Sequence, residues 1–418
     1  MVTNQADLLA PFRGERYAAR DRLNALIAPP YDVISPDERA RLAARDPHNI
    51  AHLILPQAAP PASDPYAHAA ALLADWRASK VLVRDPEPAV YVVAQEFTLP
   101  TGERRERIGM LAALRAEPYE KGRVRPHEKT HAGPKADRLA LLRATRTFLE
   151  SIFVLAPDPG GELAGGLAAV AKRPPSTRAE LDGVRLRLWV VSGDDASRLS
   201  GLASRLPVYI ADGHHRYETA IAYARENPAA ERLVAFVVSV RDPGLSVLGT
   251  HRLIQGVGVD PAKLLEQWRR WFEVGRVAPC ADRIERLEQL GRDRTACLVA
   301  FPGDYHVTLA LKADAPLDEI PELGRTPAVR ALDVARVDAL VVQALLRSGS
   351  PAPTVGYTPD PRVAFDAVRS GTAAAAVLVN PTRIEQVIAV ADAGDVMPQK
   401  STFFAPKVPS GVVLLPAE

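Results

Sequence analysis

Residues 207–223, PVYIADGHHRYETAIAY, contain the segment that decides how this chain is organised. An apolar strand pattern runs into the polar turn Asp212–Arg216 (DGHHR), and a helix pattern follows without a gap. The first N–H groups of a helix have no partner inside the helix and lie at the positive end of its dipole, so a phosphate is favoured there. The segment therefore predicts an anion-binding turn between a strand and a helix.

Each residue of this turn suits a different part of a phosphate site. Gly213 allows a sharp turn or a close approach of the backbone to a ligand. Asp212 is placed to bind Mg²⁺ rather than the phosphate itself. His214, His215 and Arg216 add donors for a polyphosphate. The alternative is a capped helix start with two surface histidines, since a short motif is only a hypothesis.

Composition limits the classes of protein to consider. The chain has 418 residues, 47% of them hydrophobic, which is enough for two or three packed domains. A net charge of +2, from 52 basic and 50 acidic residues, excludes the one-signed surface that drives non-specific nucleic-acid binding. The cysteines, Cys280 and Cys297, indicate neither a disulfide framework nor a metal cluster. Without a signal-peptide core or an apolar run of about 18 residues, we expect a cytoplasmic protein with no membrane partner.

The periodicities predict a mixed α/β (α+β) chain. A helix should begin after Ser35, an N-cap followed by Pro36, with Glu38 closing a capping box. Residues 67–80 and 136–149 read as helices, residues 89–99 and 108–114 as a hairpin, and residues 151–155, 232–240 and 246–253 as strands. We expect a boundary near residue 255, giving an N-terminal region of residues 1–255 and a C-terminal α/β region of residues 256–418 packed against it.

The second polar block is RVRPHEKTHAGPK, residues 123–135, which has no apolar stripe and predicts a loop. We expect it to turn its polar groups towards the anion site. Glu128 is the candidate catalytic base for an acceptor hydroxyl, and Lys129 would neutralise developing charge. Arg125 or Lys135 would bind an acceptor carboxylate.

The same block contains HEKTH, a match to the zinc-protease pattern. That chemistry needs His127 and His131 one turn apart on a helix, with the glutamate activating water. Gly133 and Pro134 limit any such helix to about two turns, and no third ligand is identifiable. A zinc metallohydrolase is therefore an alternative hypothesis.

The third polar block is MPQKSTFFAPK, residues 397–407. Lys400, Ser401 and Thr402 suit phosphate or carboxylate binding, whereas Phe403 and Phe404 favour packing in a core. We expect this segment to return to the active cleft. A GxxxxGK[ST] loop and a GxGxxG after a strand are both absent from the sequence, so it supports neither standard nucleotide-binding loop.

Five segments together resemble a family with a domain of unknown function, DUF1015. They are IAPPYDVIS, RPHEKT, GPKADRLALLRATR, ADGHHRYETA and MPQKSTFFAPK. The DGHHR turn also resembles the D-G-H-x-R turn of ParB/sulfiredoxin-like proteins, above all their free-serine kinases. This second resemblance implies a ParB/sulfiredoxin-like nucleotide-binding core in which Asp212, Gly213, His214 and Arg216 handle nucleotide and metal, while His215 stands at a variable position.

These features favour a phosphotransferase that moves a phosphoryl group from ATP or ADP to a small hydroxyl acceptor, with Mg²⁺ as cofactor and L-serine as the favoured acceptor. The expected partners are a nucleotide and a small amino acid. A ParB-like nucleotide-dependent DNA-binding or regulatory module is a second alternative. The near-neutral charge and the lack of a helix-turn-helix pattern oppose it, so nucleic acid is not an expected partner. The oligomeric state is left open.

Overall fold

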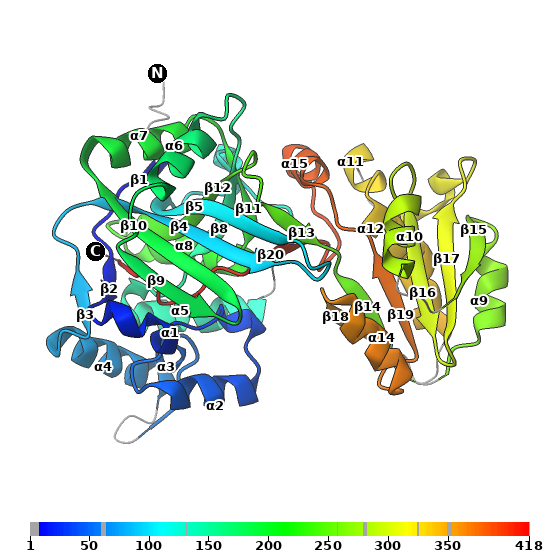
Figure 1. Cartoon of the computed structure of the whole chain (residues 1–418), viewed down its shortest axis with the longest axis horizontal. Helices are drawn as coiled ribbons and strands as arrows, with labels where there is room; N and C mark the ends of the chain where they lie inside the picture. The colour runs from blue at the N-terminus through cyan, green and yellow to red at the C-terminus, as the bar shows by residue number, and fades with distance from the viewer. Residues whose placement is uncertain are drawn as a thin grey trace. The chain divides into compact units, whose positions relative to one another are not determined.

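The computed structural model describes residues 8–59, 64–130, 132–256, 258–278, 282–323, 326–348 and 353–417. The chain divides into two compact units, one of Met1–Leu245 with Pro406–Glu418 and one of Ser246–Ala405. Each unit combines helices with a large sheet, which confirms the predicted mixed α/β class (Figure 1). The end of the chain thus belongs to the same unit as the DGHHR turn.

A nine-stranded mixed sheet forms the centre of the first unit. Its order is β6-β11-β8-β12-β5-β4-β10-β9, and β1 pairs with β5 beside this path. The strands are β1 (Leu9–Ala10), β4 (Ala89–Thr98), β5 (Arg104–Arg115), β6 (Val124–Arg125), β8 (Ile152–Ala156), β9 (Thr177–Leu181), β10 (Val184–Ser192), β11 (Val208–Asp212) and β12 (Arg232–Ser239). Two short ladders join β2 (Glu15–Tyr17) to β3 (Leu82–Arg84) and β7 (Thr147–Phe148) to β21 (Leu415–Pro416).

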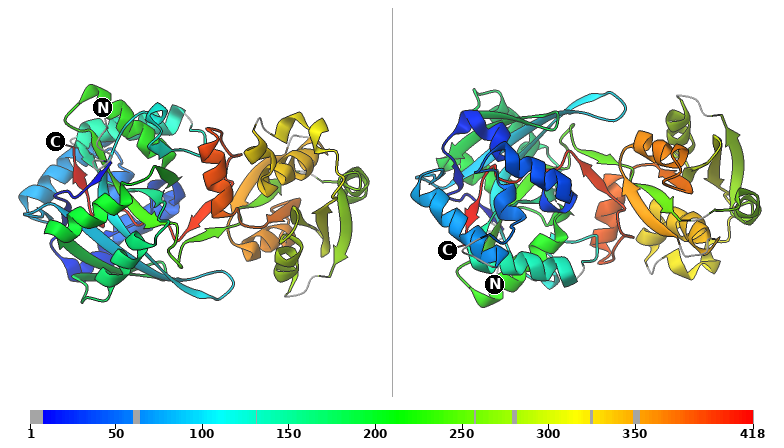
Figure 2. Two further views of the ribbon diagram at one scale, coloured as in Figure 1. Left: turned by 90° about the horizontal axis from the view of Figure 1, so that it is seen from above. Right: turned by 90° about the horizontal axis from the view of Figure 1, so that it is seen from below.

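Helices pack against this sheet in separate groups. They are α1 (Leu23–Leu26), α2 (Pro36–Arg45), α3 (Ala51–Ile54), α4 (Pro65–Ala78), α5 (Ala132–Thr145), α6 (Glu162–Ala171), α7 (Gly193–Ala203) and α8 (His214–Glu226). Helices α6 and α7 contact β4 and one another. Helix α8 contacts β8 and β12, and its other neighbours are α5 and, beyond it, α4, which contacts α5 (Figure 2). Buried aromatic side chains such as Trp76, Tyr217 and Phe236 fill the spaces between these layers.

The direction of strand pairing decides which loops meet. Strand β11 pairs in parallel with β6, so that Val208 lies opposite Val124 and Tyr209 opposite Arg125. Parallel strands end at the same edge of a sheet. The segments that follow β6 and β11, which carry RPHEKT and DGHHR, therefore leave the sheet side by side.

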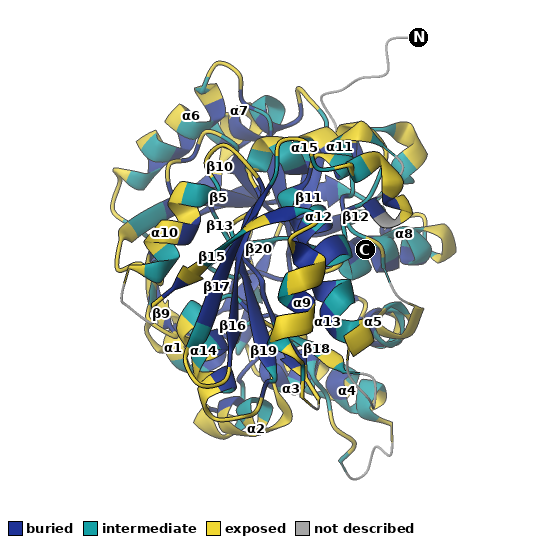
Figure 3. Ribbon diagram, turned by 90° about the vertical axis from the view of Figure 1, so that its right-hand side faces the viewer, coloured by how far each residue is buried: buried dark blue, intermediate teal, exposed yellow. Residues whose placement is uncertain are grey.

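The second unit is built on an antiparallel sheet of order β15-β17-β16-β19-β14-β18. Its strands are β14 (His251–Gln255), β15 (Phe272–Val277), β16 (Ala296–Phe301), β17 (Tyr305–Leu311), β18 (Thr354–Thr358) and β19 (Ala375–Val379). Alternate residues of β16 enter two different cores, with Cys297 and Val299 in one and Leu298 and Ala300 in the other. Helices therefore cover both faces, and the central strands β16 and β19 are buried between them (Figure 3).

The remaining elements of the second unit are short. Its helices are α9 (Pro261–Trp268), α10 (Arg283–Leu290), α11 (Pro327–Arg330), α12 (Asp333–Val337), a π-helical turn (Asp338–Val342), α13 (Gln343–Ser348), α14 (Pro361–Arg369) and α15 (Ile384–Asp392). Strand β13 (Ser246–Leu248) pairs with β20 (Phe403–Ala405). No helix in the described residues is long and apolar enough to cross a membrane.

Several predicted elements are confirmed. Ser35 accepts a hydrogen bond from the Glu38 N–H at 3.2 Å and caps α2. The predicted hairpin forms from β4 and β5, and the strand–turn–helix of residues 207–223 forms from β11 and α8.

Three predicted elements differ from the structure. Helix α5 begins at Ala132, earlier than predicted, because a proline in the first helical turn removes no hydrogen bond that the helix needs. The loop predicted over residues 123–135 therefore contains β6 and the start of this helix. The strand predicted over residues 246–253 is two strands, β13 and β14, which belong to different sheets.

Candidate functional site

The DGHHR turn joins β11 to α8 through Gly213. This residue has φ of 91°, a left-handed conformation that favours glycine. A Cβ added to it would lie 2.9 Å from Cγ2 of Ile152 and 3.1 Å from Nε of Arg216. Both the backbone and the packing therefore require glycine, and the N–H groups of the first turn of α8 follow directly.

Asp212 is held between two cations. Its Oδ2 accepts a hydrogen bond from Nη2 of Arg216 at 2.6 Å, and its Oδ1 contacts Nζ of Lys407. The side chains of all three residues are at most 19% exposed. Burial alone would raise the pKa of Asp212, but the positive charges of Lys407 and Arg216 lower it well below its ordinary value. The carboxylate is therefore ionised, and it fixes two cations beside the start of α8.

The Arg216 guanidinium is fixed on its other side by the backbone. Its Nη1 donates to the carbonyl oxygen of Ser151. Burial would lower the pKa of Arg216, but the carboxylates of Asp212, Glu150 and Asp32 outweigh this effect and raise it. Arg216 is therefore a permanently charged group in a defined orientation.

Two buried imidazoles lie beside the turn. The rings of His127 and His214 meet edge to face with centroids 4.8 Å apart, and the backbone N–H of His127 donates to Nε2 of His214 at 3.3 Å. Burial lowers the pKa of His127 to about 4 and lowers that of His214 well below its ordinary value. Both imidazoles are therefore neutral at pH 7. Because Nε2 of His214 accepts, its Nδ1 carries the proton and is a donor.

The second polar block lies next to this turn, as the β6–β11 pairing requires. His127 contacts His214 directly, and Glu128 follows it as a half-buried residue. Lys129 is exposed. Thr130 donates to Oε2 of Glu218, an α8 residue, at 2.7 Å. RPHEKT and DGHHR thus lie together at the same edge of the sheet.

The residues predicted to bind an acceptor carboxylate have partners within the protein. Nζ of Lys135 lies 2.8 Å from Oε2 of Glu218. Nε of Arg125 donates to the carbonyl oxygen of Gly122 at 3.2 Å, and its guanidinium lies 5.9 Å from the Tyr209 ring centroid. Their acceptor-binding roles remain predictions.

The geometry of HEKTH differs from that of a zinc helix. His127, Glu128, Lys129 and Thr130 are not helical, whereas the zinc motif needs both histidines one turn apart on a helix. His131 lies outside the described residues. Across the ranges given above, we find no group of three or more histidine, cysteine, aspartate or glutamate side chains that is placed to hold a metal ion.

A buried platform holds the end of the chain where Lys407 lies. Arg107 is fully buried, and its guanidinium lies 4.7 Å from the ring centroid of Phe153 and 5.4 Å from that of Phe236. Its Nη2 donates to the carbonyl oxygen of Pro406 at 2.6 Å, while Gln95 Nε2 donates to the Lys407 carbonyl oxygen at 3.1 Å. Two backbone contacts on adjacent residues therefore fix the segment that brings Lys407 to Asp212.

Other residues of the third block belong to the second unit. Ser401 donates from Oγ to the carbonyl oxygen of Pro398 at 2.5 Å, and its own carbonyl oxygen accepts from Thr382 Oγ1 at 2.8 Å. Lys400 has φ of 55° and is exposed. The phosphate-binding roles of Lys400, Ser401 and Thr402 remain predictions.

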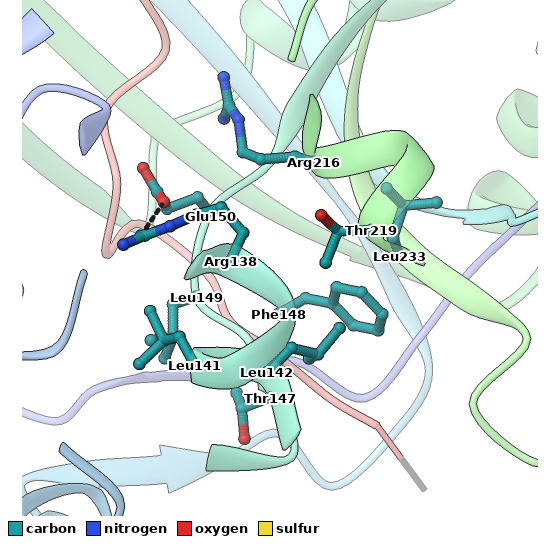
Figure 4. Close-up of a pocket in the computed structure, with 10 residues that line it drawn as sticks. All are labelled: Arg138, Leu141, Leu142, Thr147, Phe148, Leu149, Glu150, Arg216, Thr219 and Leu233. Carbon is teal, nitrogen blue, oxygen red and sulfur yellow. Dashed lines mark ion pairs between the residues drawn. The ribbon is translucent and has the colours of Figure 1, made fainter. Parts of the chain in front are cut away.

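A second set of charged residues, for which the sequence predicted no role, lies around a cavity that Arg216 also lines. Oε1 of Glu150 accepts from the Tyr31 N–H at 2.9 Å and from Ser410 Oγ at 3.0 Å, and Oε2 lies 3.6 Å from Nη1 of Arg138. Figure 4 shows Arg138 and Glu150 paired, with Arg216 lining the same small cavity of about 50 Å³. The Arg138 guanidinium also lies 4.2 Å from the Tyr31 ring centroid. The segments IAPPYD and GPKADR, which carried the family resemblance, were the available signal for these residues.

A family model and several solved structures are similar to large parts of this chain. The model of a family described as "Protein of unknown function (DUF1015)" matches residues 9–335. No protein with curated annotation matches. Similar solved structures include a free serine kinase in complex with AMP, at 13% identity and TM-score 0.36, covering 71% of this chain and 87% of that one. A conserved hypothetical protein from Pyrococcus furiosus has 16% identity and TM-score 0.35, with coverage of 72% and 93%. SbnI from Staphylococcus aureus has 11% identity and TM-score 0.35, with coverage of 71% and 84%.

Proposed function

The chain belongs to the DUF1015 family of proteins of unknown function, and from that premise we propose that it is a nucleotide-dependent phosphotransferase acting on a small amino acid, with free L-serine as the favoured acceptor. One observation carries the proposal. Arg216 and Lys407 are held by the shared carboxylate of Asp212 at the first turn of α8. Phosphoryl transfer depends mainly on positioning and on charge stabilisation, and cations fixed beside the positive end of a helix dipole supply both.

The proposed reaction transfers one phosphoryl group. The hydroxyl oxygen of the acceptor attacks the terminal phosphorus of ATP or ADP and forms a new P–O bond. The bond from that phosphorus to the bridging oxygen breaks, so that ADP or AMP leaves. The hydroxyl proton passes to Glu128, the candidate base. Arg216 and Lys407 offset the charge that develops on the phosphate oxygens.

The turn itself offers donors to the nucleotide phosphates. We propose that the backbone at Gly213, the neutral His214 through Nδ1–H, His215 and Arg216 contact phosphate oxygens. Lys129 is exposed on the adjacent segment and would neutralise the transferred group. A neutral imidazole suits this role because it donates a hydrogen bond without competing with Arg216 for Asp212.

The residues at Asp212 do not fit a bound Mg²⁺ in their present arrangement. Both carboxylate oxygens contact cations, and a metal would have to displace Lys407 or Arg216 to reach them. We therefore assign no step of the transfer to a metal. Mg²⁺ binding by Asp212 stays a prediction, tested by titrating Mg²⁺ into the nucleotide complex.

The experiment is a phosphorus-NMR assay of purified protein with Mg²⁺, ATP or ADP, and L-serine within a panel of amino acids. Asp212→Ala is compared with Lys172→Met, which removes an exposed lysine far along the chain from the turn. Circular dichroism establishes that both variants fold. We expect an O-phosphoserine signal that is lost in Asp212→Ala and kept in Lys172→Met.

Full turnover by a folded Asp212→Ala variant would reject the proposal. Nucleotide binding without transfer to any acceptor, together with salt-dependent DNA binding, would favour a regulatory module instead. Absence of nucleotide binding would reject the phosphate-binding role of the DGHHR turn.

A further inference from the structure

A cleft of about 370 Å³ opens in the first unit where α2, α4 and α5 meet the IAPPYD segment. Its polar lining includes Tyr31, Arg39, Gln57, Tyr66, Asp137 and Arg138. This volume lies at the lower end of the roughly 300–1,000 Å³ range of small-molecule sites. The cleft therefore has room for a small metabolite.

The lining combines a positive group and a negative group. Nε of Arg39 donates to the carbonyl oxygen of Leu55 at 3.0 Å, and within the described ranges Arg39 makes no ion pair with a carboxylate. Arg39 is partly buried, which limits the solvation of its charge by water and lowers the pKa of the guanidinium. A ligand carboxylate would replace the missing solvation.

Asp137 supplies the negative group. Its Oδ1 accepts from the Tyr66 hydroxyl at 2.7 Å. Its Oδ2 accepts from Nε of Arg138 at 2.7 Å and lies 2.6 Å from Nη2 of the same guanidinium. Its side chain remains 43% exposed. A carboxylate has about four acceptor positions, so these three contacts leave about one position, on Oδ1, for a ligand ammonium group.

A shared cavity and the Glu150–Ser151 segment connect the cleft to the DGHHR turn, since Arg216 donates to the carbonyl oxygen of Ser151. Arg138 lines the cleft, stacks on Tyr31 and pairs with Glu150. Arg138, Glu150 and Arg216 also line the small cavity in Figure 4. Burial raises the pKa of Tyr31 to about 12, and the positive charges of Arg216 and Arg138 act against this increase. Arg138 thus contacts Tyr31 in the cleft and also lines the cavity of Arg216, the residue that we expect to contact phosphate.

We propose that this cleft binds the acceptor as a zwitterionic α-amino acid, with Arg39 pairing with its carboxylate and Asp137 with its ammonium group. The assignment of this ligand as the acceptor rests on the proposed function. In this site the acceptor carboxylate pairs with Arg39 and not with Lys135, whose Nζ already pairs with Glu218.

Calorimetric titration of the nucleotide-free, full-length protein tests this site. The ligands are L-serine, L-threonine and L-homoserine, with ethanolamine as a probe that lacks the carboxylate and D-glycerate as a probe that lacks the ammonium group. Loss of one charge-assisted hydrogen bond weakens binding about ten- to hundredfold. We expect at least one of the three amino acids to bind and both probes to bind more weakly by this factor.

The variant Arg39→Gln should weaken amino-acid binding about ten- to hundredfold. Arg41→Gln is the matched control, since Arg41 is exposed on the same helix and does not line the cleft. Asp137→Asn should weaken binding of the amino acid while leaving D-glycerate nearly unaffected. Equal affinities in the Arg39→Gln and Arg41→Gln variants, or no binding of any of the three amino acids to wild type, would overturn the proposal.

The wild-type ligand series decides the question if Arg39→Gln does not fold. Equal affinity for the amino acids and for the two probes would overturn the proposal without any variant. Binding that depends on both charges supports the site even where the phosphorus-NMR assay shows no transfer. Failure of the proposed function and failure of this inference are therefore distinguishable.

Discussion

Replacing Lys407 with methionine tests whether the ion pairs of Asp212 stabilise the first unit. The substitution keeps a long side chain and removes the ammonium group that contacts Oδ1 of Asp212. The two side chains are 19% and 16% exposed, so water cannot fully replace the contact. Arg216 still binds Oδ2 at 2.6 Å, and the carboxylate keeps one cation.

The expected loss follows from these contacts. Removing the only partner of a buried charge costs about 3–5 kcal/mol. Because Arg216 remains, we expect a smaller loss of about 2 kcal/mol, within the range of about 1.5–3 kcal/mol for a hydrogen bond to a charged group. This loss corresponds to a decrease of roughly 30-fold in the folding equilibrium constant.

The loss should depend on pH in a defined direction. Lys407 and Arg216 together hold the pKa of Asp212 below its ordinary value, against the opposing effect of burial. The resulting stabilisation is complete above the unfolded-state pKa of about 4 and is lost as pH falls through the folded-state pKa. Removing Lys407 raises the folded-state pKa. The difference in the free energy of unfolding between wild type and variant should therefore be largest at pH 7 and decrease below about pH 4.

Hydrogen exchange of the β11 and α8 amides in increasing urea measures this free energy for the first unit alone. Lys172→Met serves as the control for loss of an exposed lysine in the same unit. A difference below about 0.5 kcal/mol at pH 7, the usual range for surface substitutions, would refute the reasoning. A difference of equal size at pH 7 and pH 3 would also refute it.

Three further predictions concern the turn. Gly213→Ala should destabilise the first unit by about 1–3 kcal/mol, because alanine is strained at φ of 91° and its Cβ would contact β8. The control Gly165→Ala, at an open position of α6, should not lower the free energy of unfolding in the same hydrogen-exchange measurement. Both His127 and His214 should stay neutral between pH 5 and 8 in nitrogen-15 NMR spectra, and titration of either ring near pH 6.5 would contradict their burial. Because histidines of the unfolded chain become protonated near pH 6.5, the free energy of unfolding should decrease as pH falls from about 6.5 towards 4. Arg216→Lys should weaken ADP binding at least about tenfold in calorimetry, since lysine cannot contact the Ser151 carbonyl and the Asp212 carboxylate simultaneously in the same geometry. Unchanged affinity for ADP would exclude Arg216 from the phosphate site.

Local features of the fold were predictable because neighbouring residues specify them. Ser35, Pro36 and Glu38 define the start of α2 through capping and through the fixed φ of proline. Apolar strand patterns predicted β4, β5, β8 and β12, and the DGHHR turn follows from a glycine between an apolar strand and a helix pattern. The same reasoning failed at residues 246–253. There Gly249 lies between β13 and β14, and its backbone approaches a distant segment so closely that a Cβ would lie 2.3 Å from the carbonyl oxygen of Val379.

The mixed α/β class, the cap of α2 and the DGHHR turn with its glycine and charged residues were all predictable from the sequence. The tertiary structure alone decided which of those charges meet. Parallel pairing of β6 with β11 places His127 against His214, and Lys407 reaches Asp212 across 195 residues of sequence. Helix and strand propensities and helix caps depend on residues that are close in sequence, so they do not predict which distant segments pair. The pairing of distant charges, and with it each pKa, depends on packing and burial that exist only after the sheet has formed.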